Sequence, residues 1–528
     1  MAVEFELDGV AVRVVDESAS LLEALRGELR VRSVKDGCSP QGQCGCCTVL
    51  VDGAPRVACV TPVRRVRGRR VTTLEGLDES TRGLWAKAFC ACGASQCGFC
   101  TPGIVLRLEA LRRAGSVRDL GAVERALSAH LCRCTGWRTI LEAWELACGS
   151  TADVASGPRD LELPPRDAKG AEARALIEGG VSQRVGPEVV LGQGGFASDT
   201  APPDCLIAVP DQHGEWHVAE TLAEARRAVG KVQGRRSTAP VEPPLSLPEG
   251  RWDLALRTSW VEPAYLEPDA SWCEPGGEPW SPVANGGAFG GKSTSPLPAV
   301  ARRLADEYGK PVLALWWRED VTRHGPKRPP VAIGVDSRGH GVCRVVRTPG
   351  IAERIRAVDE DLVVEEVEVP GPPTSADIRA AGWAEAAVVT SVVRGTPGRV
   401  RDPWGGEAEA TVEEGKVFVR VRCGDPLDLV TLRSYCIGAA HMAIGWVTSE
   451  GLAVGPDGEV QDLTIRSFGV LKASETPPIE VEVDESGGEP VRASDAVFAA
   501  VASAVWYSQG CPVDWPTRTR VREAAGRC

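Results

Sequence analysis

The feature that most constrains this chain is the cysteine spacing between residues 97 and 134. Cys97 and Cys100 form a CxxC pair, and after 31 intervening residues Cys132 and Cys134 form a CxC pair. Four thiolates in two close pairs make a tetrahedral sulfur site, which suits an iron–sulfur cluster or zinc. We call these four residues the second cysteine set, and we expect the fold to bring its two pairs together.

A first cysteine set lies upstream and bears on the choice of metal. Cys38, Cys44, Cys47 and Cys59 are spaced much as in plant-type ferredoxins. Two such sets within the first 150 residues indicate a two-cluster electron-transfer module, because one zinc ion would suffice to staple a domain of this size. The sequence therefore predicts two [2Fe–2S] clusters.

Composition narrows the class of protein. The 528 residues are enough for about three domains. A formal net charge of −12 argues against nucleic acid or an anionic membrane as a partner. Of the 19 cysteines, 11 precede residue 135, in pairs and without a preceding signal peptide, which disfavours a secreted disulfide scaffold. No apolar run approaches the ~18 residues of a membrane span. We expect a cytoplasmic protein whose thiols are available for metal.

Residues 1–76 have the pattern of a β-grasp domain. Alternating apolar residues over 3–15 surround Asp8-Gly9, which predicts a hairpin. Ser20 and Glu23 stand in the capping-box relation at the start of a short helix. A cysteine-rich loop over 36–47 and a strand over 48–53 follow.

Residues 77–148 are helical in character. Thr101 is expected to cap a helix with Pro102 at its first position and Gly115 at its end. Further helices are expected over 117–131 and after Gly136-Trp137. The second cysteine set then lies at helix termini, where unpaired backbone N–H groups can donate to cluster sulfurs.

The rest of the chain gives weaker signals. Residues 149–185 are rich in Ser, Ala, Gly, Asp and Pro, which predicts a surface linker. Residues 186–528 have the pattern of a mixed α/β region. Apolar runs predict strands at 312–317, 331–335, 387–393 and 417–421.

Residues 1–148 resemble the iron–sulfur portion of the xanthine oxidase family of molybdenum hydroxylases. The resemblance rests on Gly37-Cys38, Gln43-Cys44-Gly45 and Cys47-Thr48-Val49, on Gln96-Cys97-Gly98-Phe99-Cys100-Thr101-Pro102-Gly103, and on Leu131-Cys132-Arg133-Cys134-Thr135-Gly136. It implies an α+β chain: a β-grasp [2Fe–2S] ferredoxin domain, a four-helix [2Fe–2S]-binding domain, and a contracted mixed α/β region like the family's molybdopterin-binding domain.

The first cysteine set departs from the family pattern. Five residues separate Cys38 from Cys44, where the family has four, and Cys46 stands where the family has a small residue that is not a ligand. The sequence therefore allows either Cys46 or Cys47 as the third ligand of the first cluster. Cys90 and Cys92 form a further CxC pair, interpreted as small semi-buried residues or as an additional redox pair.

The C-terminal part resembles the family's molybdopterin-binding subunit more thinly. The matching segments are Ala264-Tyr265-Leu266-Glu267-Pro268, Gly286-Gly287-Ala288-Phe289-Gly290-Gly291-Lys292, Lys327-Arg328-Pro329-Pro330 and Gly488-Glu489-Pro490. The resemblance implies that the cofactor and substrate are contacted by Gln96, Gly287, Phe289, Gly290 and Arg328. It implies Glu489 as the general base, a role that suits a carboxylate.

Other family segments have no counterpart. The region 186–528 is much shorter than the family's molybdenum portion. The family's Arg-Gly-Phe-Gly segment has no counterpart between Lys327-Arg328-Pro329-Pro330 and the C-terminus, and the Gly-Gln-Gly segment that cradles the pterin has none at its expected place after the strand at 417–421. The resemblance therefore implies molybdopterin as a cofactor, but about half of the segments expected to bind it are absent. No flavin domain or dinucleotide fingerprint is visible, so electrons are expected to leave to another protein or a small acceptor.

Three functions agree with the sequence. The chain is an electron-transfer protein whose molybdenum-like region is a scaffold, with a catalytic or flavin subunit among its partners. Alternatively, it is a compact hydroxylase of aldehydes or N-heterocycles with Glu489 as base. In the third hypothesis, its clusters serve as a redox sensor without catalytic current.

Overall fold

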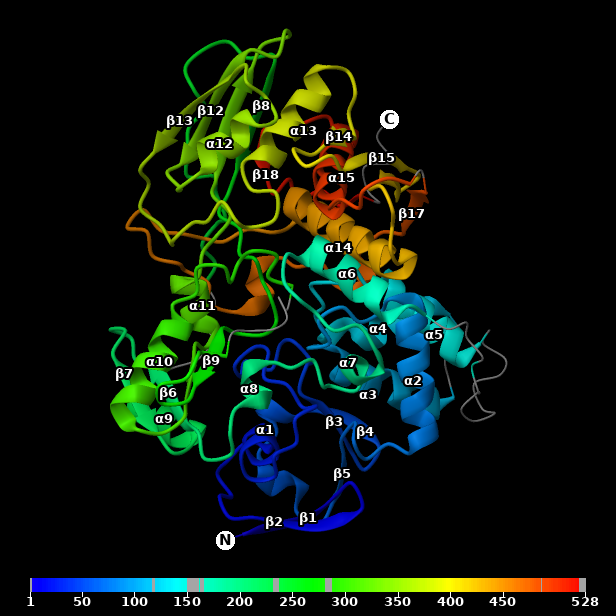
Figure 1. The fold of residues 1–528 in the computed structure, drawn as a ribbon, viewed down its shortest axis with the longest axis vertical. Helices are drawn as coiled ribbons and strands as arrows, with labels where there is room; N and C mark the ends of the chain where they lie inside the picture. Colours follow the sequence, from blue (N-terminus) through cyan, green and yellow to red (C-terminus); the bar gives the residue numbers. More distant parts are fainter. Residues whose placement is uncertain are drawn as a thin grey trace.

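The computed structural model describes residues 2–115, 119–149, 161, 166–230, 237–280, 287–485 and 487–521. In Figure 1 the N-terminal sheet lies at the bottom, the helices that follow it lie to the right, and the C-terminal half rises above both. Among the described residues no helix is long and apolar enough to cross a membrane.

The N-terminal region is a five-stranded sheet in the order β2-β1-β5-β3-β4. The predicted hairpin at Asp8-Gly9 is confirmed, with Val3 paired to Val14. The capping box of Ser20 and Glu23 is also present, on a helix of a single turn. The elements are β1 (Val3–Leu7), β2 (Val10–Val14), α1 (Leu21–Glu23), η1 (Ala24–Glu28), β3 (Thr48–Val51), β4 (Ala54–Val57), η2 (Ala58–Val60), η3 (Val63–Val66) and β5 (Arg70–Thr72).

Helices dominate the next segment. They are α2 (Glu79–Cys92), α3 (Thr101–Ala114), α4 (Leu120–Ala126), η4 (Leu127–Ala129) and α5 (Arg138–Cys148). Helix α3 ends at Gly115 as predicted, but it begins one residue early, with Cys100 at the N-cap and Thr101 inside the helix. The start of the helix predicted over 117–131 lies outside the described residues.

The prediction of a surface linker over 149–185 is wrong for residues 168–179, which form a helix. Residues 150–160 and 162–165 lie outside the described residues, but α6 (Ala168–Gly179) is a regular helix. Its Arg174 is fully buried and donates to the carbonyl oxygens of Pro426 and Asp425. The small buried residues Ala171 and Ala175 let α6 pack closely. Because linkers are also rich in small residues, the composition of this helix resembles that of a linker.

A small lobe follows, at the left in Figure 1. Its sheet has the order β7-β6-β10-β9. The helices α7 (Pro187–Val190), which packs against α2, and α8 (Ala197–Thr200) precede this lobe. The elements of the lobe are β6 (Leu206–Pro210), β7 (Trp216–Ala219), α9 (Leu222–Val229), β9 (Ala270–Cys273), α10 (Leu297–Tyr308), β10 (Val312–Leu315) and α11 (Arg318–His324).

Two further sheets and four helices build the upper part. The sheet orders are β13-β12-β11-β8-β18 and β14-β15-β16-β17. The strands are β8 (Leu254–Thr258), β11 (Val331–Val335), β12 (Gly341–Val346), β13 (Leu362–Val367), β14 (Arg399–Arg401), β15 (Glu407–Glu413), β16 (Lys416–Arg422), β17 (Ile479–Asp484) and β18 (Asp514–Trp515). The helices are α12 (Ile351–Arg356), α13 (Trp383–Val393), α14 (Leu429–Thr448) and α15 (Ser494–Ser508), with the short helices η6 (Ile465–Phe468) and η7 (Ala473–Glu475).

Strand predictions are confirmed at β10, β11 and β16 but wrong at 387–393. That run is the second half of α13, which is capped at its start by Glu385 accepting from the Gly382 amide. A helix buried on nearly every side shows no apolar period, so its sequence cannot be told from that of a buried strand.

One hydrophobic core includes residues from both the N-terminal region and the segment around η6. The core of residues 3–148 also includes Leu463, Ile465 and Phe468 from the segment around η6. The C-terminal part is therefore packed into the cysteine-containing region as well as lying beside it.

Candidate metal centres

The second cysteine set comes together as two sulfur pairs. The Sγ atoms of Cys97 and Cys134 lie 3.6 Å apart, and the thiols of Cys100 and Cys132 lie within hydrogen-bond reach. All four side chains are buried. Two sulfurs bonded at about 2.3 Å to one tetrahedral metal ion lie roughly 3.8 Å apart. The Cys97–Cys134 pair therefore has the spacing of two ligands on one ion.

The first cysteine set is also paired. Cys38 contacts Cys44, and Cys47 contacts Cys59. Cys38 is also within reach of Cys59, so the two pairs adjoin. The extra cysteine, Cys46, is buried beside Cys44, with its sulfur 3.8 Å from the Cys44 carbonyl oxygen.

Hydrogen-bond donors surround these sulfurs. The Cys38 sulfur accepts from the amides of Gln41 at 3.1 Å and Gln43 at 3.5 Å. In the second set, the Thr135 hydroxyl lies 3.1 Å from the Cys132 sulfur. Hydrogen bonds from the Cys100 thiol and then from Thr135 lower the pKa of Cys132, although burial opposes this. Such donors favour thiolates, which are the ligand form of cysteine.

The pairwise arrangement bears on the kind of metal site. No three His, Cys, Asp or Glu side chains in the described ranges converge on a position for a single metal ion. In a [2Fe–2S] cluster each iron takes two of the four cysteines. The donor chemistry and the pairing of both sets thus fit such clusters.

A direct backbone link connects the two sets. The Leu131 amide, beside Cys132, donates to the carbonyl oxygen of Cys44 at 3.0 Å. Behind this link, buried His130 lies 3.2 Å through its Nε2 from the Thr48 hydroxyl. Desolvation by burial lowers the pKa of His130 to about 4, so the ring is neutral at pH 7. The loops of the two sets therefore form one continuous buried unit.

Helix α14 covers the second cysteine set from the C-terminal side. Gln96 Nε2 donates to the Cys134 carbonyl at 2.9 Å and to the Ser434 hydroxyl of α14 at 3.1 Å. A Cβ on Gly438 would lie 1.7 Å from the Cys134 carbonyl oxygen, so the backbones touch there. Gln96 and Cys134 are the residues that the resemblance places against a pterin, and in this structure α14 occupies that face.

The glycine-rich loop also reaches the second set, although Gly286 lies outside the described residues. A Cβ on Gly287 would lie 3.3 Å from the Cys134 sulfur. Gly290, at φ +92°, passes so close to the Asp377 carbonyl that no side chain would fit. Between them, the Phe289 ring is covered by the guanidinium of Arg379, 3.6 Å from the ring centroid.

Three buried arginines near this loop each have a carboxylate partner. Arg133 binds Glu450, Arg328 binds Glu385, and Arg379 binds Asp495 at 3.0 Å. Arg328 also stacks on the Trp446 ring at 4.0 Å. The cavity that these arginines line is about 20 Å³, roughly the room for one water molecule. Small-molecule pockets are typically on the order of 300–1,000 Å³.

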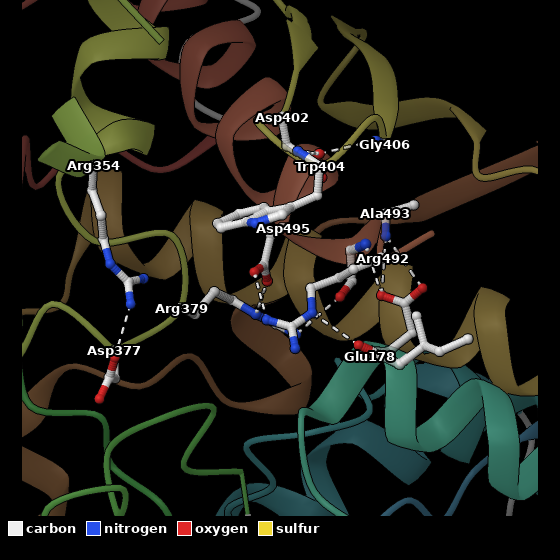
Figure 2. Close-up of polar contacts among 12 residues, drawn as sticks. Glu178, Arg354, Asp377, Arg379, Asp402, Trp404, Gly406, Arg492, Ala493 and Asp495 are labelled. Atoms are coloured by element: carbon white, nitrogen blue, oxygen red, sulfur yellow. Dashed lines mark hydrogen bonds and ion pairs between the residues drawn. The ribbon is translucent and has the colours of Figure 1, made fainter. Parts of the chain in front are cut away.

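Glu489 does not join this group. Its side chain is exposed in the loop between β17 and α15, and it does not line the cavity. The carboxylate at the N-terminus of α15 is instead Glu178 of α6, which accepts from the Ser494 amide at 2.9 Å. Figure 2 shows Glu178 beside Ala493 and the neighbouring Arg379–Asp495 pair. Glu489 as general base stays a prediction, without support from this placement.

The same close-up contains a second buried carboxylate. Asp402 Oδ1 accepts from the amides of Trp404 and Gly406 at 2.8 and 2.9 Å. Desolvation by burial raises the pKa of Asp402 to about 6. These bonds close a turn after β14 and do not face the cavity.

The C-terminal region also braces the first cysteine set. Gln41 donates to the Leu463 carbonyl at 2.8 Å, and the Arg466 side chain donates to the Gln43 carbonyl at 3.1 Å. From another direction, the buried Arg318 donates to the Gly37 carbonyl at 2.7 Å. The enlarged Cys38–Cys44 spacing thus forms a loop that contacts η6 and the residues before it.

Sequence reasoning missed the residues that make these long-range contacts. Arg133 stands between two ligand cysteines and could have been singled out, because a buried arginine needs a partner. Glu450 and Ser434 carry no local signal, since their roles depend on where α14 packs.

Comparison with known proteins identifies the family. A family model described as a [2Fe-2S] binding domain matches residues 73–145, which contain the second cysteine set. One probable xanthine dehydrogenase subunit, from Bacillus subtilis, is 35% identical over 140 residues, covering 26% of this chain and 79% of that protein. The chain belongs to the xanthine dehydrogenase/aldehyde oxidase family.

Within this family the matches differ in extent. Aldehyde oxidase 1 of Oryctolagus cuniculus is 38% identical over 151 residues, which is 26% of this chain but 11% of that protein. The chain thus matches only a small part of such relatives. The aldehyde oxidoreductase of Desulfovibrio desulfuricans superposes with a TM-score of 0.70 at 14% identity, covering 99% of both chains. That likeness confirms a mixed α/β fold resembling aldehyde oxidoreductase.

Proposed function

We propose that this chain is a two-[2Fe–2S] electron-transfer protein that passes electrons between a molybdenum-hydroxylase-type site and an external acceptor. The observation that carries the proposal is the pairing of all eight cysteines into four buried sulfur pairs, on loops joined by the Leu131–Cys44 hydrogen bond. A [2Fe–2S] cluster carries one electron at a time.

The sulfur pairs support a proposed ligand assignment. Cys38 and Cys44 hold one iron of the first cluster, and Cys47 and Cys59 hold the other. Cys47, not Cys46, is the third ligand, because its sulfur is the one beside Cys59. In the second cluster the iron ligands are Cys97 with Cys134 and Cys100 with Cys132.

Molybdopterin does not fit the described residues around the glycine-rich loop. Helix α14 covers the face of Gln96 and Cys134, the three arginines are paired with carboxylates, and the cavity is of water size. The hydroxylase site therefore belongs to a partner chain, and the acceptor is a redox protein or a small molecule. In this proposal the much longer relatives carry in one chain the parts that are divided here between this chain and its partner.

The C-terminal region then acts as a scaffold. It supplies Arg318 and the segment around η6 to the first cysteine loop, and α14 to the second. Excluding water from both cysteine loops lowers the local dielectric and limits side reactions of reduced clusters.

Single-cluster variants test the proposal. Cys100→Ser should remove the EPR signal of the second cluster and keep that of the first, while Cys47→Ser should do the reverse. Each variant should retain about two of the four iron atoms per chain. Loss of both signals in each single variant, or a wild-type protein with no iron–sulfur spectrum, would contradict the two-site assignment.

A further inference from the structure

Two backbone amides that donate to the Cys38 sulfur both belong to glutamines. The Gln41 amide nitrogen lies 3.1 Å from this sulfur, and the Gln43 amide nitrogen lies 3.5 Å from it. A backbone N–H is a permanent donor, so the strength of these two bonds depends on where the loop places the amides. Whatever holds the two glutamines therefore acts on the Cys38 sulfur.

The Gln41 side chain is held by three hydrogen bonds to residues far along the chain. Its Nε2 donates to the Leu463 carbonyl at 2.8 Å and to Glu319 Oε1 at 3.0 Å. Its Oε1 accepts from the Ile465 amide at 3.1 Å. Both polar atoms of the side-chain amide are thus engaged, and Gln41 cannot turn without breaking at least one of these bonds.

Gln43 is held by the next residue of the same segment. Its Oε1 accepts from the Arg466 amide at 3.2 Å, and its backbone carbonyl accepts from the Arg466 side chain at 3.1 Å. Ile465 and Arg466 are the first two residues of η6, and the first amides of a helix have no partner within it. The side chains of Gln41 and Gln43 therefore supply the acceptors that these amides need.

The turn between the two glutamines is also tightly packed. Gly42, at φ +70°, lies against Val60, and a Cβ on this glycine would meet a Val60 methyl carbon at 2.8 Å. Five residues separate Cys38 from Cys44, one more than in the family pattern, and both glutamines lie in this longer loop. The loop therefore keeps its shape through Val60 and through the segment 463–466.

We propose that Gln41 and Gln43 couple the segment 463–466 to the first cluster and thereby raise the reduction potential of that cluster. The segment fixes the two glutamines, which in turn hold their backbone amides on the Cys38 sulfur. This inference rests on the proposed two-cluster function. One-electron reduction adds negative charge that is shared by the ligand sulfurs, so donors on Cys38 stabilise the reduced state more than the oxidised one. Both glutamines are positioning residues, and no proton or covalent bond changes.

The coupling gives the C-terminal region a role beyond that of a scaffold. Among the described residues, the side chains of Gln41 and Gln43 make no hydrogen bond to the second cysteine set. Their effect therefore falls on the first cluster and leaves the second unchanged. A higher potential at the first cluster favours electron flow toward it from the second.

Redox titration with dithionite, followed by EPR, tests the inference on the full-length protein. Gln41→Met keeps the backbone amide and the side-chain length but loses all three side-chain hydrogen bonds. It should lower the equilibrium constant for reduction of the first cluster roughly two- to tenfold, up to the worth of one hydrogen bond, and shift the EPR signal of that cluster alone. Gln43→Met should have the same effect by a smaller factor, because the Gln43 amide lies farther from the Cys38 sulfur.

The matched control is Gln509→Met at the end of α15. Gln509 is also half-buried, and its Nε2 donates to a backbone carbonyl, that of Thr519, at 2.9 Å. This variant loses a comparable side-chain hydrogen bond away from the segment 463–466. It should change the potential and the EPR signal of neither cluster.

The outcomes separate this inference from the function on which it rests. Unchanged first-cluster potentials in Gln41→Met and Gln43→Met, or an equal shift of both clusters, overturn the coupling alone. Loss of the first cluster in both variants, with the second retained, makes the glutamines requirements for assembly and also overturns it. Absence of both clusters from the wild type overturns the proposed function itself.

Discussion

The cysteine loops and the glycine-rich loop are two regions in which the same family resemblance had different structural outcomes. Around the cysteines the motif residues lie in metal-binding geometry, with sulfur pairs such as Cys97 and Cys134 at 3.6 Å. Around the glycine-rich loop the motif residues Phe289 and Arg328 are present, but they pack against other side chains of the chain. Matching residues thus indicate a site only where the structure leaves room for the group.

The largest expected effect comes from breaking the ion pair between Arg133 on the second cysteine loop and Glu450 just after α14. Glu450→Ala leaves the buried Arg133 guanidinium, on the second cysteine loop, without its carboxylate. Breaking a buried ion pair in this way should cost about 3–5 kcal/mol of unfolding free energy. Chemical denaturation measures it.

The control for that variant is Glu482→Ala, which breaks an exposed pair with Arg420. It should cost less than about 1 kcal/mol. Equal costs for the two variants would mean that the Arg133–Glu450 ion pair does not hold the second cysteine loop against the C-terminal part.

The next effect is a loss of stability in acid, through His441 on α14. Desolvation by burial, with the nearby Arg133 charge, lowers the pKa of His441 to about 4 from an ordinary value of 6.5. Between these pH values the unfolded chain binds a proton that the folded chain does not. The contribution of neutral His441 to the free energy of unfolding is therefore fully present above pH 6.5, and it falls by up to about 3 kcal/mol as the pH drops to 4.

Denaturation midpoints at pH 7 and pH 5 check this dependence. His441→Gln should flatten the pH dependence, whereas substitution of the exposed His340 should leave it as in the wild type. An unchanged slope in His441→Gln would show that the histidine on α14 is not held neutral.

A smaller effect is expected where α14 touches Cys134. Gly438→Ala would place a methyl group against the Cys134 carbonyl and should cost about 1–3 kcal/mol by overpacking. The EPR signal of the second cluster should shift while that of the first does not. Gly83→Ala in α2, where a methyl group meets nothing within 4 Å, should be neutral or stabilising.

The smallest effect is expected at Glu489. Glu489→Gln changes an exposed loop residue, so iron content and both EPR signals should stay the same, and stability should change by less than about 0.5 kcal/mol. Aldehyde or N-heterocycle oxidation that the wild type performs and the variant loses would instead establish Glu489 as a catalytic base.

Local patterns were predictable from the sequence. The Asp8-Gly9 hairpin, the Ser20–Glu23 capping box and the end of α3 at Gly115 depend on neighbouring residues, so the chain specifies them directly. The approach of the CxxC segment to the CxC segment was also expected from their spacing, whereas the sulfur contacts Cys97–Cys134 and Cys100–Cys132, which join one cysteine of each segment, were not.

Features set by distant packing were not predictable. The run 387–393 is apolar in a way that suits both a buried strand and the buried helix α13. The composition of α6 concealed the buried Arg174. Above all, the position of α14 over Gln96 and Cys134 depends on contacts more than 300 residues apart in sequence, and this position decides whether a pterin could fit.

The most direct test of a two-cluster chain without molybdopterin is the iron, molybdenum and pterin content of the full-length protein, purified from a host that makes molybdopterin. We expect about four iron atoms per chain, from two [2Fe–2S] clusters, and neither molybdenum nor pterin. Near-stoichiometric molybdenum and pterin would contradict it and would make the chain a compact hydroxylase.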